Sequence, residues 1–309
     1  MFLSLLLTGF FTFVELNCEN LFDYLQDEGK QDTEYLPEAT RHWTKKRYWR
    51  KLNNIAQELL SCSDDGIPDM IALCEVENDS VMRDLTKRSL LRNAGYEYLM
   101  TSSPDQRGID VALVYSPFSF APVCSYSIRV EPVKGMRATR DILYVSGETV
   151  SGDTLHVFVV HQPSNFGGVK YTRPFREVVA ARLCQSVDSI YTISPSAKVL
   201  IAGDFNDGSE GYSLQKYYQH GFVNITRNAL SDNGVKGTYR YKGEWESIDH
   251  ILCSPYIYNK VYSAKIHSPL FLLEEELHFG GVRPRRTYNG MRYQPGYSDH
   301  LPLVVQFTF

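Results

Sequence analysis

The stretch Val199-Leu200-Ile201-Ala202-Gly203-Asp204-Phe205-Asn206 decides the fold of this 309-residue chain. Its apolar residues have the character of a buried strand, and they end at a glycine that is followed by an acid and an amide. Side chains two positions apart on a strand point the same way, so Asp204 and Asn206 can reach one spot together. Such a pair can hold and deprotonate a water molecule, or contact a metal and a phosphate oxygen.

The same run is also compatible with an ordinary turn, because Gly-Asp starts many turns. It gains weight from a second run near the C-terminal end of the sequence, Tyr297-Ser298-Asp299-His300-Leu301-Pro302-Leu303. Two polar endings of this kind in one chain make a functional site more plausible than two unrelated turns.

Composition bounds the classes of protein that fit. The length allows one large α/β domain or two smaller ones. A net charge of −4 argues against a general electrostatic grip on nucleic acid, leaves a local basic cleft open, and suits an acidic site neutralised by a divalent cation. The six cysteines form no Cys-x-x-Cys pair, so we predict buried thiols and no zinc or redox site.

The first ten residues are mostly apolar. They are too few for a membrane span of about 20 residues, and they lack the basic leading region of a signal peptide. They also lead directly into the first predicted strand. A degenerate export signal and a hydrophobic first element both fit, so an exported and a cytoplasmic protein both stay open, and no membrane span is expected.

Apolar runs of strand character alternate with helical patterns along the whole chain, and no linker or repeat divides it. This organisation favours a single large α/β sandwich over residues 11–309, which we expect to be a monomer. The predicted strands are 11–16, 70–74, 111–115, 143–145, 155–160, 199–202, 248–253 and 303–309. The predicted helices are 48–62, 80–93 capped by Ser80, 174–190 with Pro174 in its first turn, and 214–220.

Five segments place polar residues where a predicted strand ends. Singly, each has an ordinary interpretation as a turn, a surface acid or a hydrogen-bonded loop histidine. Together they indicate a site, because sites in α/β folds gather at the carboxyl ends of strands. Carboxylates, amides and imidazoles without a serine or cysteine nucleophile favour metal-assisted hydrolysis by water, with Mg²⁺ or Mn²⁺ rather than zinc. The segments are residues 16–22, residues 72–78, residues 161–165, the Asp204/Asn206 run and the Asp299-His300 run.

In their order, these segments resemble the endonuclease/exonuclease/phosphatase superfamily, which has the pancreatic-deoxyribonuclease-like fold. Residues 107–115 and 161–182 resemble a bacterial branch of it found in Bacteroidetes-type genomes. The resemblance implies a four-layer α/β sandwich, in which two packed mixed or antiparallel sheets are flanked by helices and the site lies at one rim. The matching motifs are Asn17-x-Glu19-Asn20, Glu75, His161-x-Pro163-Ser164, Gly203-Asp204-Phe205-Asn206, Thr238 to Trp245, Ile248-Asp249-His250 and Ser298-Asp299-His300-Leu301-Pro302.

The resemblance also implies catalytic roles. Asp204 would orient and deprotonate the attacking water, and Asn206 would hold a phosphate oxygen. His300 would stabilise the charge that develops on phosphorus. Asp249 would orient His300, and this pair has an independent rationale, because a carboxylate fixes the tautomer of an imidazole and favours its charged form. His161 matches a position where some members place an acid for the leaving group.

Further residues are implied for the metal and the substrate. Glu75 would be the principal Mg²⁺ ligand. Asn17 would help to position the ion or the phosphate, and Asp299 and Glu19 would be further ligands, although Glu19 stands where many relatives have Asp. The residues expected to contact the substrate are Arg107, Asp110, Thr238, Arg283 and Arg286.

Two expectations concern departures from the family pattern. A tyrosine that some relatives place before the strand 111–115 is absent, and Arg107 or Asp110 is expected to substitute for it. We predict that Asp110 pairs with His161. The basic stretch Arg41 to Lys51 offers either phosphate contacts with aromatic residues that stack on bases, or a solvated basic face over the core.

The leading hypothesis is a Mg²⁺-dependent phosphodiesterase that acts on nucleic acid, as a nuclease. The alternative is a phosphatase or phosphodiesterase on a phosphorylated lipid or sugar, such as an inositol phosphate or sphingomyelin. An inactive binding module is disfavoured, because each carboxylate, amide and histidine of the core motifs is present.

Overall fold

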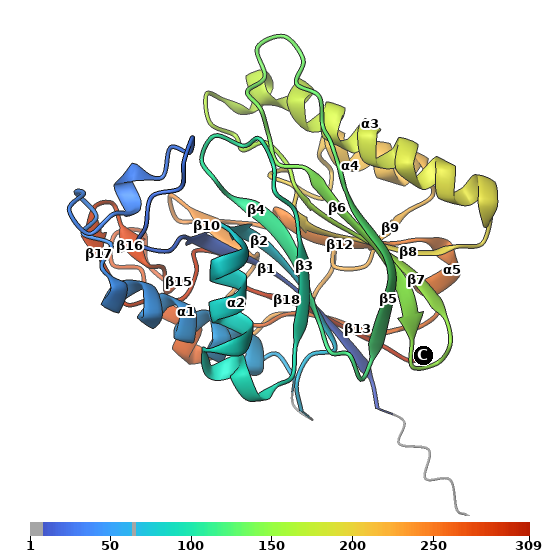
Figure 1. Cartoon of the computed structure of the whole chain (residues 1–309), viewed down its shortest axis with the longest axis horizontal. Coiled ribbons are helices and arrows are strands. Elements are labelled where there is room, and N and C mark those ends of the chain that lie inside the picture. The colour runs from blue at the N-terminus through green and yellow to red at the C-terminus, as the bar shows by residue number, and fades with distance from the viewer. Residues whose placement is uncertain (1–8, 64–65) are drawn as a thin grey trace, which may run out of the picture.

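Two six-stranded sheets form the centre of the computed structural model, which describes residues 9–63 and 66–309 (Figure 1). The first sheet has the order β13-β18-β1-β2-β4-β3. In it β1 and β2 run parallel, and the other neighbouring strands are antiparallel. Its strands are β1 (Phe11–Leu21), β2 (Met70–Val76), β3 (Glu97–Met100), β4 (Asp110–Tyr115), β13 (Val261–Ile266) and β18 (Leu303–Phe307).

The second sheet has the order β5-β6-β7-β8-β12-β9. Again one pair is parallel, β7 with β8, and the remaining pairs are antiparallel. The parallel pair of each sheet therefore brings two carboxyl ends to the same rim. Its strands are β5 (Phe120–Ile128), β6 (Ile142–Thr149), β7 (Thr154–His161), β8 (Lys198–Asp204), β9 (Val223–Asn224) and β12 (Asp249–Cys253).

The two sheets pack face to face, and helices cover their outer faces (Figure 1). Phe13 and Leu113 of the first sheet meet Val157 and Leu200 of the second in one apolar core. A second core lies between the first sheet and α1 and α2, and a third lies between the second sheet and α3 and α4. The predicted four-layer α/β sandwich is confirmed. The helices are α1 (Lys45–Leu60), α2 (Asp79–Lys87), α3 (Val169–Ile193), α4 (Tyr212–Gln219) and α5 (Pro255–Tyr258).

Short elements decorate the rim that carries the parallel strand ends. They include three β-hairpins: β10 (Tyr239–Tyr241) with β11 (Glu244–Glu246), β14 (Leu273–Glu275) with β15 (Val282–Pro284), and β16 (Tyr288–Asn289) with β17 (Arg292–Tyr293). The 3₁₀ turns are η1 (Thr33–Tyr35), η3 (Leu270–Leu272) and η2 (Leu90–Asn93), and η2 precedes β3 at the opposite end of the first sheet.

The predicted strands are all present, but two helix boundaries were wrong. Asn78, not Ser80, caps α2, because its side chain accepts the Val81 N–H at 3.0 Å. That helix ends at Lys87, and the residues up to Asn93 form the separate turn η2. Pro174 lies inside α3 rather than in its first turn, since the helix begins five residues earlier at Val169.

Of the apolar N-terminal segment predicted over residues 1–10, residues 1–8 lie outside the described residues. Phe10 stacks on Tyr262 with ring centroids 4.2 Å apart, directly before β1. All six cysteines are free thiols, and five of them are buried as predicted, with Cys124 exposed. Within the described residues, no helix combines the length and the apolar character needed to cross a membrane.

Candidate active site

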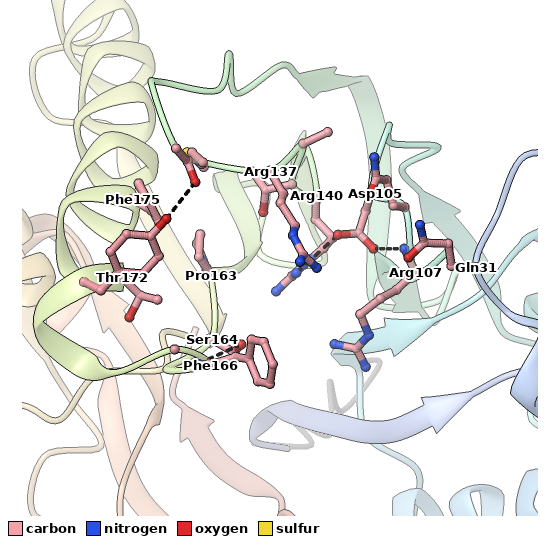
Figure 2. A pocket seen from close by; sticks show the side chains of 17 residues that line it. Gln31, Asp105, Arg107, Arg137, Arg140, Pro163, Ser164, Phe166, Thr172 and Phe175 are labelled. Carbon is pink, nitrogen blue, oxygen red and sulfur yellow. Dashed lines mark hydrogen bonds and ion pairs between the residues drawn. The ribbon is translucent and has the colours of Figure 1, made fainter.

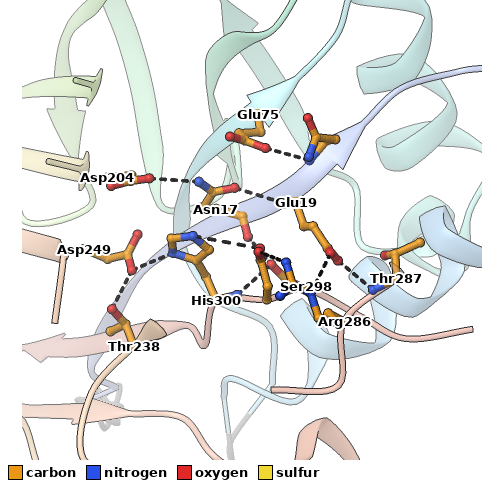
Figure 3. Close-up of polar contacts among 12 residues, drawn as sticks. Asn17, Glu19, Glu75, Asp204, Thr238, Asp249, Arg286, Thr287, Ser298 and His300 are labelled. Carbon is orange, nitrogen blue, oxygen red and sulfur yellow. Dashed lines mark hydrogen bonds and ion pairs between the residues drawn. The ribbon is translucent and has the colours of Figure 1, made fainter. Parts of the chain in front are cut away.

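The polar residues predicted from the strand ends converge on one rim of the sandwich (Figure 3). The first sheet contributes Asn17 from β1 and Glu75 from β2, and the second contributes His161 from β7 and Asp204 from β8. Asp249 is the first residue of β12 and lies opposite Asp204 in the ladder. The segment that leads into β18 adds Asp299 and His300, and His300 bridges to Tyr239 of the β10 hairpin.

The backbone of this rim is strained where the polar side chains are presented. Glu19, Asn20, Glu75 and Asn206 all have positive φ, between 49° and 61°. Residues other than glycine seldom adopt this region, and each instance costs about 1–3 kcal/mol. Such strain clusters at functional sites, so these four residues support the assignment of this rim as the site.

Gly203 is required by the close approach of β7 and β8. Its φ is 145°, and a Cβ at this position would lie 1.8 Å from the carbonyl oxygen of Val160. Gly203 therefore allows the parallel pair of β7 and β8 to extend as far as Asp204. It places the acid level with His161 of the neighbouring strand.

Asp204 lies at the centre of the cluster and is almost completely buried. Its Oδ2 accepts a hydrogen bond from Asn17 Nδ2 at 3.0 Å and lies 3.5 Å from His161 Nε2, while its Oδ1 accepts the Asn206 N–H at 2.8 Å. Burial, together with the nearby charge of Asp249, raises the pKa of Asp204 to about 7. A carboxylate with this pKa can exchange a proton near neutral pH.

Asp249 and His300 form a buried pair. Asp249 Oδ2 lies 2.8 Å from His300 Nδ1 and also accepts a hydrogen bond from Thr238 Oγ1 at 2.5 Å. Burial alone would lower the pKa of His300, but the carboxylates of Asp249, Asp299 and Asp204 outweigh it and raise that pKa well above its usual value. His300 is therefore an imidazolium at neutral pH, and its Nε2 is left to face the cluster.

Glu75 is held at the mouth of β2. Its Oε2 accepts the Asn20 N–H at 2.8 Å. Its Oε1 lies near two nitrogen groups, Arg107 Nη2 at 3.6 Å and His161 Nε2 at 3.9 Å. Arg107 also donates to Asn20 Oδ1 at 2.5 Å. One carboxylate oxygen is thus fixed by the backbone and the other faces the centre of the site.

Glu19 and Asp299 share the guanidinium group of Arg286. Arg286 Nη2 donates to Asp299 Oδ2 at 2.6 Å, and its Nε donates to Glu19 Oε1 at 3.4 Å. The other Glu19 oxygen accepts the Thr287 N–H at 2.7 Å and lies 3.4 Å from Lys51 Nζ. Glu19 and Asp299, the two carboxylates expected as further metal ligands beside Glu75, are therefore both engaged by protein donors.

The predicted pair between Asp110 and His161 is wrong. Asp110 lies at the start of β4, where its Oδ1 accepts from Thr101 Oγ1 at 2.6 Å and both oxygens accept from the Ser103 N–H. His161 Nδ1 has no hydrogen-bond partner in the described part of the chain. Burial and the charges of Arg140 and Arg107 hold the pKa of His161 well below its usual value, so its imidazole is neutral.

Arg283 lies away from the cluster in β15, where it pairs with Glu274 at 2.8 Å and Glu276 at 2.7 Å. In the stretch Arg41 to Lys51, the side chains of Trp43 and Tyr48 are buried in the core beside α1. Lys51 is buried as well and donates to Thr287 Oγ1 at 2.8 Å and to the carbonyl of Tyr297. These three side chains cannot present a stacking surface to a ligand.

Sequence reasoning missed one acidic residue that lies beside the site. Glu15 precedes Asn17 by two positions on β1 and is fully buried, and neither of its carboxylate oxygens has a hydrogen-bond partner among the described residues. Burial and the charges of Asp249 and Asp204 raise the pKa of Glu15 well above its usual value. The period-two pattern of β1 was the available signal, since it places Glu15 and Asn17 on one face.

The oxygen donors at this rim fit a hard divalent cation. They come from Asn17, Glu75, Asp204, Asp249 and Asp299. Carboxylate oxygens dominate this set, and Asp249 Oδ1 is buried without a hydrogen-bond partner among the described residues. Asp204, Asp249 and His300 offer atoms within 4.8 Å of one another. His300 is a poor ligand, because its Nδ1 is bound to Asp249 and its ring is protonated. Oxygen ligands favour Mg²⁺ or Mn²⁺ over zinc.

Residues 12–308 match the Endonuclease/Exonuclease/phosphatase family. No curated protein matches the sequence. Among solved structures, the mannosyl-6-phosphatase of Bacteroides thetaiotaomicron aligns with a TM-score of 0.64 at 16% identity, over 96% of this chain and 99% of that one. Truncated TDP2 of Caenorhabditis elegans aligns with a TM-score of 0.61 at 17% identity, over 97% and 98% of the two chains.

The catalytic domain of human Nocturnin with bound sulfate aligns with a TM-score of 0.58 at 19% identity, over 97% of this chain and 94% of that one. Identities this low show a common fold and leave the substrate open. The family match, by contrast, spans nearly the whole sequence and includes each strand-end motif of the rim. The chain belongs to the endonuclease/exonuclease/phosphatase family, whose members are phosphoesterase hydrolases.

Proposed function

We propose that the protein is a Mg²⁺-dependent phosphodiesterase that cleaves its substrate by in-line attack of water. The observation that carries the proposal is the juxtaposition of two groups with opposite protonation demands. Asp204, with a pKa of about 7, lies beside the Asp249–His300 pair, in which the imidazole is charged. Carboxylates and histidines whose pKa values are driven apart mark the base and the electrophile of a site.

Asp204 is the group that orients and deprotonates the water. Its Oδ2 is fixed by Asn17, and its Oδ1 is fixed by the Asn206 N–H. Both bonds hold the carboxylate in one orientation, which is what a general base needs before the substrate binds.

His300 and Asn206 bind the phosphate oxygens. The imidazolium of His300 is oriented by Asp249 and Thr238 and stabilises negative charge that develops on phosphorus. Asn206 Nδ2 donates one hydrogen to Gln162 O at 3.1 Å, and its second hydrogen is available for a phosphate oxygen. His161 is neutral, and a neutral imidazole suits hydrogen-bond donation better than proton delivery to a leaving group.

Glu75 would hold the cation, with Asn17 and Asp299 beside it. When bound, such a cation neutralises phosphate charge and lowers the pKa of a coordinated water. Glu19 is held by Thr287, Lys51 and Arg286, so we assign it to positioning the Arg286 guanidinium rather than to the cation.

We favour a nucleic-acid or nucleotide phosphodiester as substrate. The alternative is a phosphatase acting on a phosphorylated sugar, and the neighbour titled mannosyl-6-phosphatase supports testing it. The experiment is a panel of plasmid DNA, single-stranded DNA, RNA, bis-p-nitrophenyl phosphate and sugar phosphates, each with Mg²⁺ or with EDTA.

Asp204→Asn and His300→Gln should each lower kcat by at least about a hundredfold, the size expected for loss of an acid–base or oxyanion-binding group. Asp188→Asn and His220→Gln are the matched controls. Asp188 lies in α3 and His220 at the end of α4, where the two residues pair with each other away from the rim. If wild type hydrolyses no member of the panel, the proposal fails.

A further inference from the structure

A cavity of about 540 Å³ opens beside the catalytic cluster (Figure 2). Three loops line it together with Gln31 and the first turns of α3. The loop before β4 contributes Asp105 and Arg107, the loop before β6 contributes Arg137 and Arg140, and the loop after β7 contributes Phe166. Its volume lies in the range of pockets that enclose small ligands, about 300–1,000 Å³.

Two contacts connect this cavity to the site. Arg107 lines the cavity, and its Nη2 lies 3.6 Å from Glu75 Oε1. The carbonyl oxygen of Gln162 accepts hydrogen bonds from Arg140 on the cavity side at 3.0 Å and from Asn206 on the site side at 3.1 Å. A substrate whose scissile phosphate lies at the cluster can therefore extend directly into the cavity.

The charge of the cavity lining favours an anionic ligand. The Arg137 side chain is exposed at the cavity and makes no hydrogen bond or ion pair with any described residue. Arg140 is 7% exposed, its Nε has no partner among those residues, and the Thr139 Oγ1 beside it is also buried without one. Asp105, 3.4 Å from Arg140, is the one carboxylate in the lining. Asp105 offsets Arg140, and Glu75 lies 3.6 Å from Arg107, so the positive charge of Arg137 is left without a counter-charge among the described residues, although the chain as a whole is acidic.

The rim of the cavity also carries a free aromatic face. Phe166 is 83% exposed, so its ring is open to a ligand beside the guanidinium groups of the lining. Tyr171 and Phe175 pack edge to face farther along the lining, with ring centroids 5.3 Å apart. An exposed ring next to guanidinium groups suits a flat, polar ring such as a nucleobase, which stacks without sequence preference.

The geometry points to a nucleotide subsite. The cavity takes the nucleoside attached to the scissile phosphate, with its base on Phe166 and a second phosphate on Arg137 and Arg140. This inference rests on the proposed function and narrows its substrate class to nucleotides with a further phosphate, or to the end of a strand. A sugar phosphate would supply an anion without a nucleobase. An inorganic phosphate would supply neither a nucleobase nor a covalent connection to the scissile phosphate.

The test uses three substrates with the same p-nitrophenol leaving group, each with Mg²⁺. They are bis-p-nitrophenyl phosphate, thymidine 5′-(p-nitrophenyl phosphate), and the same thymidine ester with a 3′-phosphate. In wild type, we expect the 3′-phosphate to raise kcat/KM about tenfold or more, the effect of one charge-assisted hydrogen bond. Arg137→Ala should bring this ratio close to one.

Phe166→Ala should lower kcat/KM for both thymidine esters relative to bis-p-nitrophenyl phosphate by about tenfold, and Phe166→Trp should restore it. The matched controls are Arg83→Ala on α2 and Phe118→Ala, which is 85% exposed and does not line the cavity. If the 3′-phosphate has no effect in wild type, or if both controls change the ratios as much as the test variants, the subsite is refuted.

A binding measurement separates this inference from the proposed function. Thymidine 3′,5′-bisphosphate is titrated calorimetrically into EDTA-treated protein. We expect binding that Arg137→Ala weakens about tenfold and Arg83→Ala leaves intact, with ribose 5-phosphate competing poorly. Equal competition by ribose 5-phosphate would overturn the nucleobase assignment. Failure of wild type to hydrolyse any member of the substrate panel would instead overturn the proposed function.

Discussion

Asn17 Nδ2 donates a hydrogen bond to Asp204 Oδ2 over 3.0 Å, and this bond joins the two sheets of the sandwich. Asn17 belongs to β1 of the first sheet and Asp204 to β8 of the second. The carboxylate proposed as the base is thus oriented by a residue from the opposite sheet.

We therefore expect Asn17→Ala to lower kcat about tenfold or more, because the carboxylate loses one of the bonds that orient it. Asn17→Asp adds a like charge, which raises the pKa of Asp204 further and moves the acidic limb of the pH–rate profile to higher pH. Asn53→Ala, on α1, is the matched control. An unshifted acidic limb in Asn17→Asp would contradict the assignment of Asp204 as the base.

The activity should depend on pH in a bell shape. The rate rises as Asp204 ionises through its pKa of about 7, and it falls as His300 loses its proton at a pKa well above the usual value. In Asp249→Asn the carboxylate that supports the imidazolium is lost, so burial lowers the pKa of His300 and the alkaline limb moves to lower pH. Full pH–rate profiles of both proteins check this, and an unchanged alkaline limb would falsify the role of the pair.

Arg286 bridges Glu19 and Asp299 at the edge of the site, and it is one of the residues predicted to contact the substrate. Arg286→Ala should raise KM for the p-nitrophenyl substrates about tenfold, because a charge-assisted contact to phosphate is lost. The neighbouring Arg285 is exposed and serves as the control variant, Arg285→Ala. Equal KM values for the two variants would place the phosphate elsewhere.

Gly203→Ala tests the close approach of β7 and β8. The added Cβ would lie 1.8 Å from the Val160 carbonyl oxygen, so the pair must separate or the strand must shift. We expect the free energy of unfolding to fall by about 3 kcal/mol or more, as is typical of severe backbone clashes. Gly208→Ala is the control, since nothing lies within 4 Å of its built Cβ. Urea unfolding of both variants measures the difference.

Glu58 of α1 tests the effect of burial on a lone acid. Burial, opposed by the charge of Lys51, raises the pKa of Glu58 to about 8. Between about pH 4.3, the ordinary value, and about pH 8, the folded state holds a proton that the unfolded state has released, so stability falls as pH rises.

Glu58→Gln cannot ionise, so this variant should not lose folding stability through position 58 as the pH rises. Its stability relative to wild type should increase by up to about 1 kcal/mol per pH unit across that window and then level off. Urea unfolding at a series of pH values measures it, and parallel pH profiles of the two proteins would refute the burial argument.

The parts of the fold that could be predicted are those where apolar runs reveal buried strands. β8 and β2 are fully buried over nearly their whole length, and the polar residues that follow such strands were predicted to form the site. β5 was not predicted, because most of its residues are exposed at the edge of a sheet and carry no apolar run.

Contacts between distant segments could not be predicted from local patterns. Lys51 reads as one more residue of a basic stretch, yet it is buried against Thr287, 236 residues farther along the chain. Asp110 was paired with the wrong residue, because the register of β4 on β3 brings it to Thr101 rather than to the end of β7. Ladder register is a property of the assembled sheet, and the sequence around Asp110 does not contain it.

The origin of the site in two separate sheets has a consequence for how activity arises during folding. Glu75 and Asn17 come from one sheet, and Asp204, Asp249 and His161 come from the other. A folding intermediate with either sheet formed alone holds only part of the constellation. Recovery of activity during refolding therefore reports the docking of the two sheets, and it should lag behind the recovery of secondary structure.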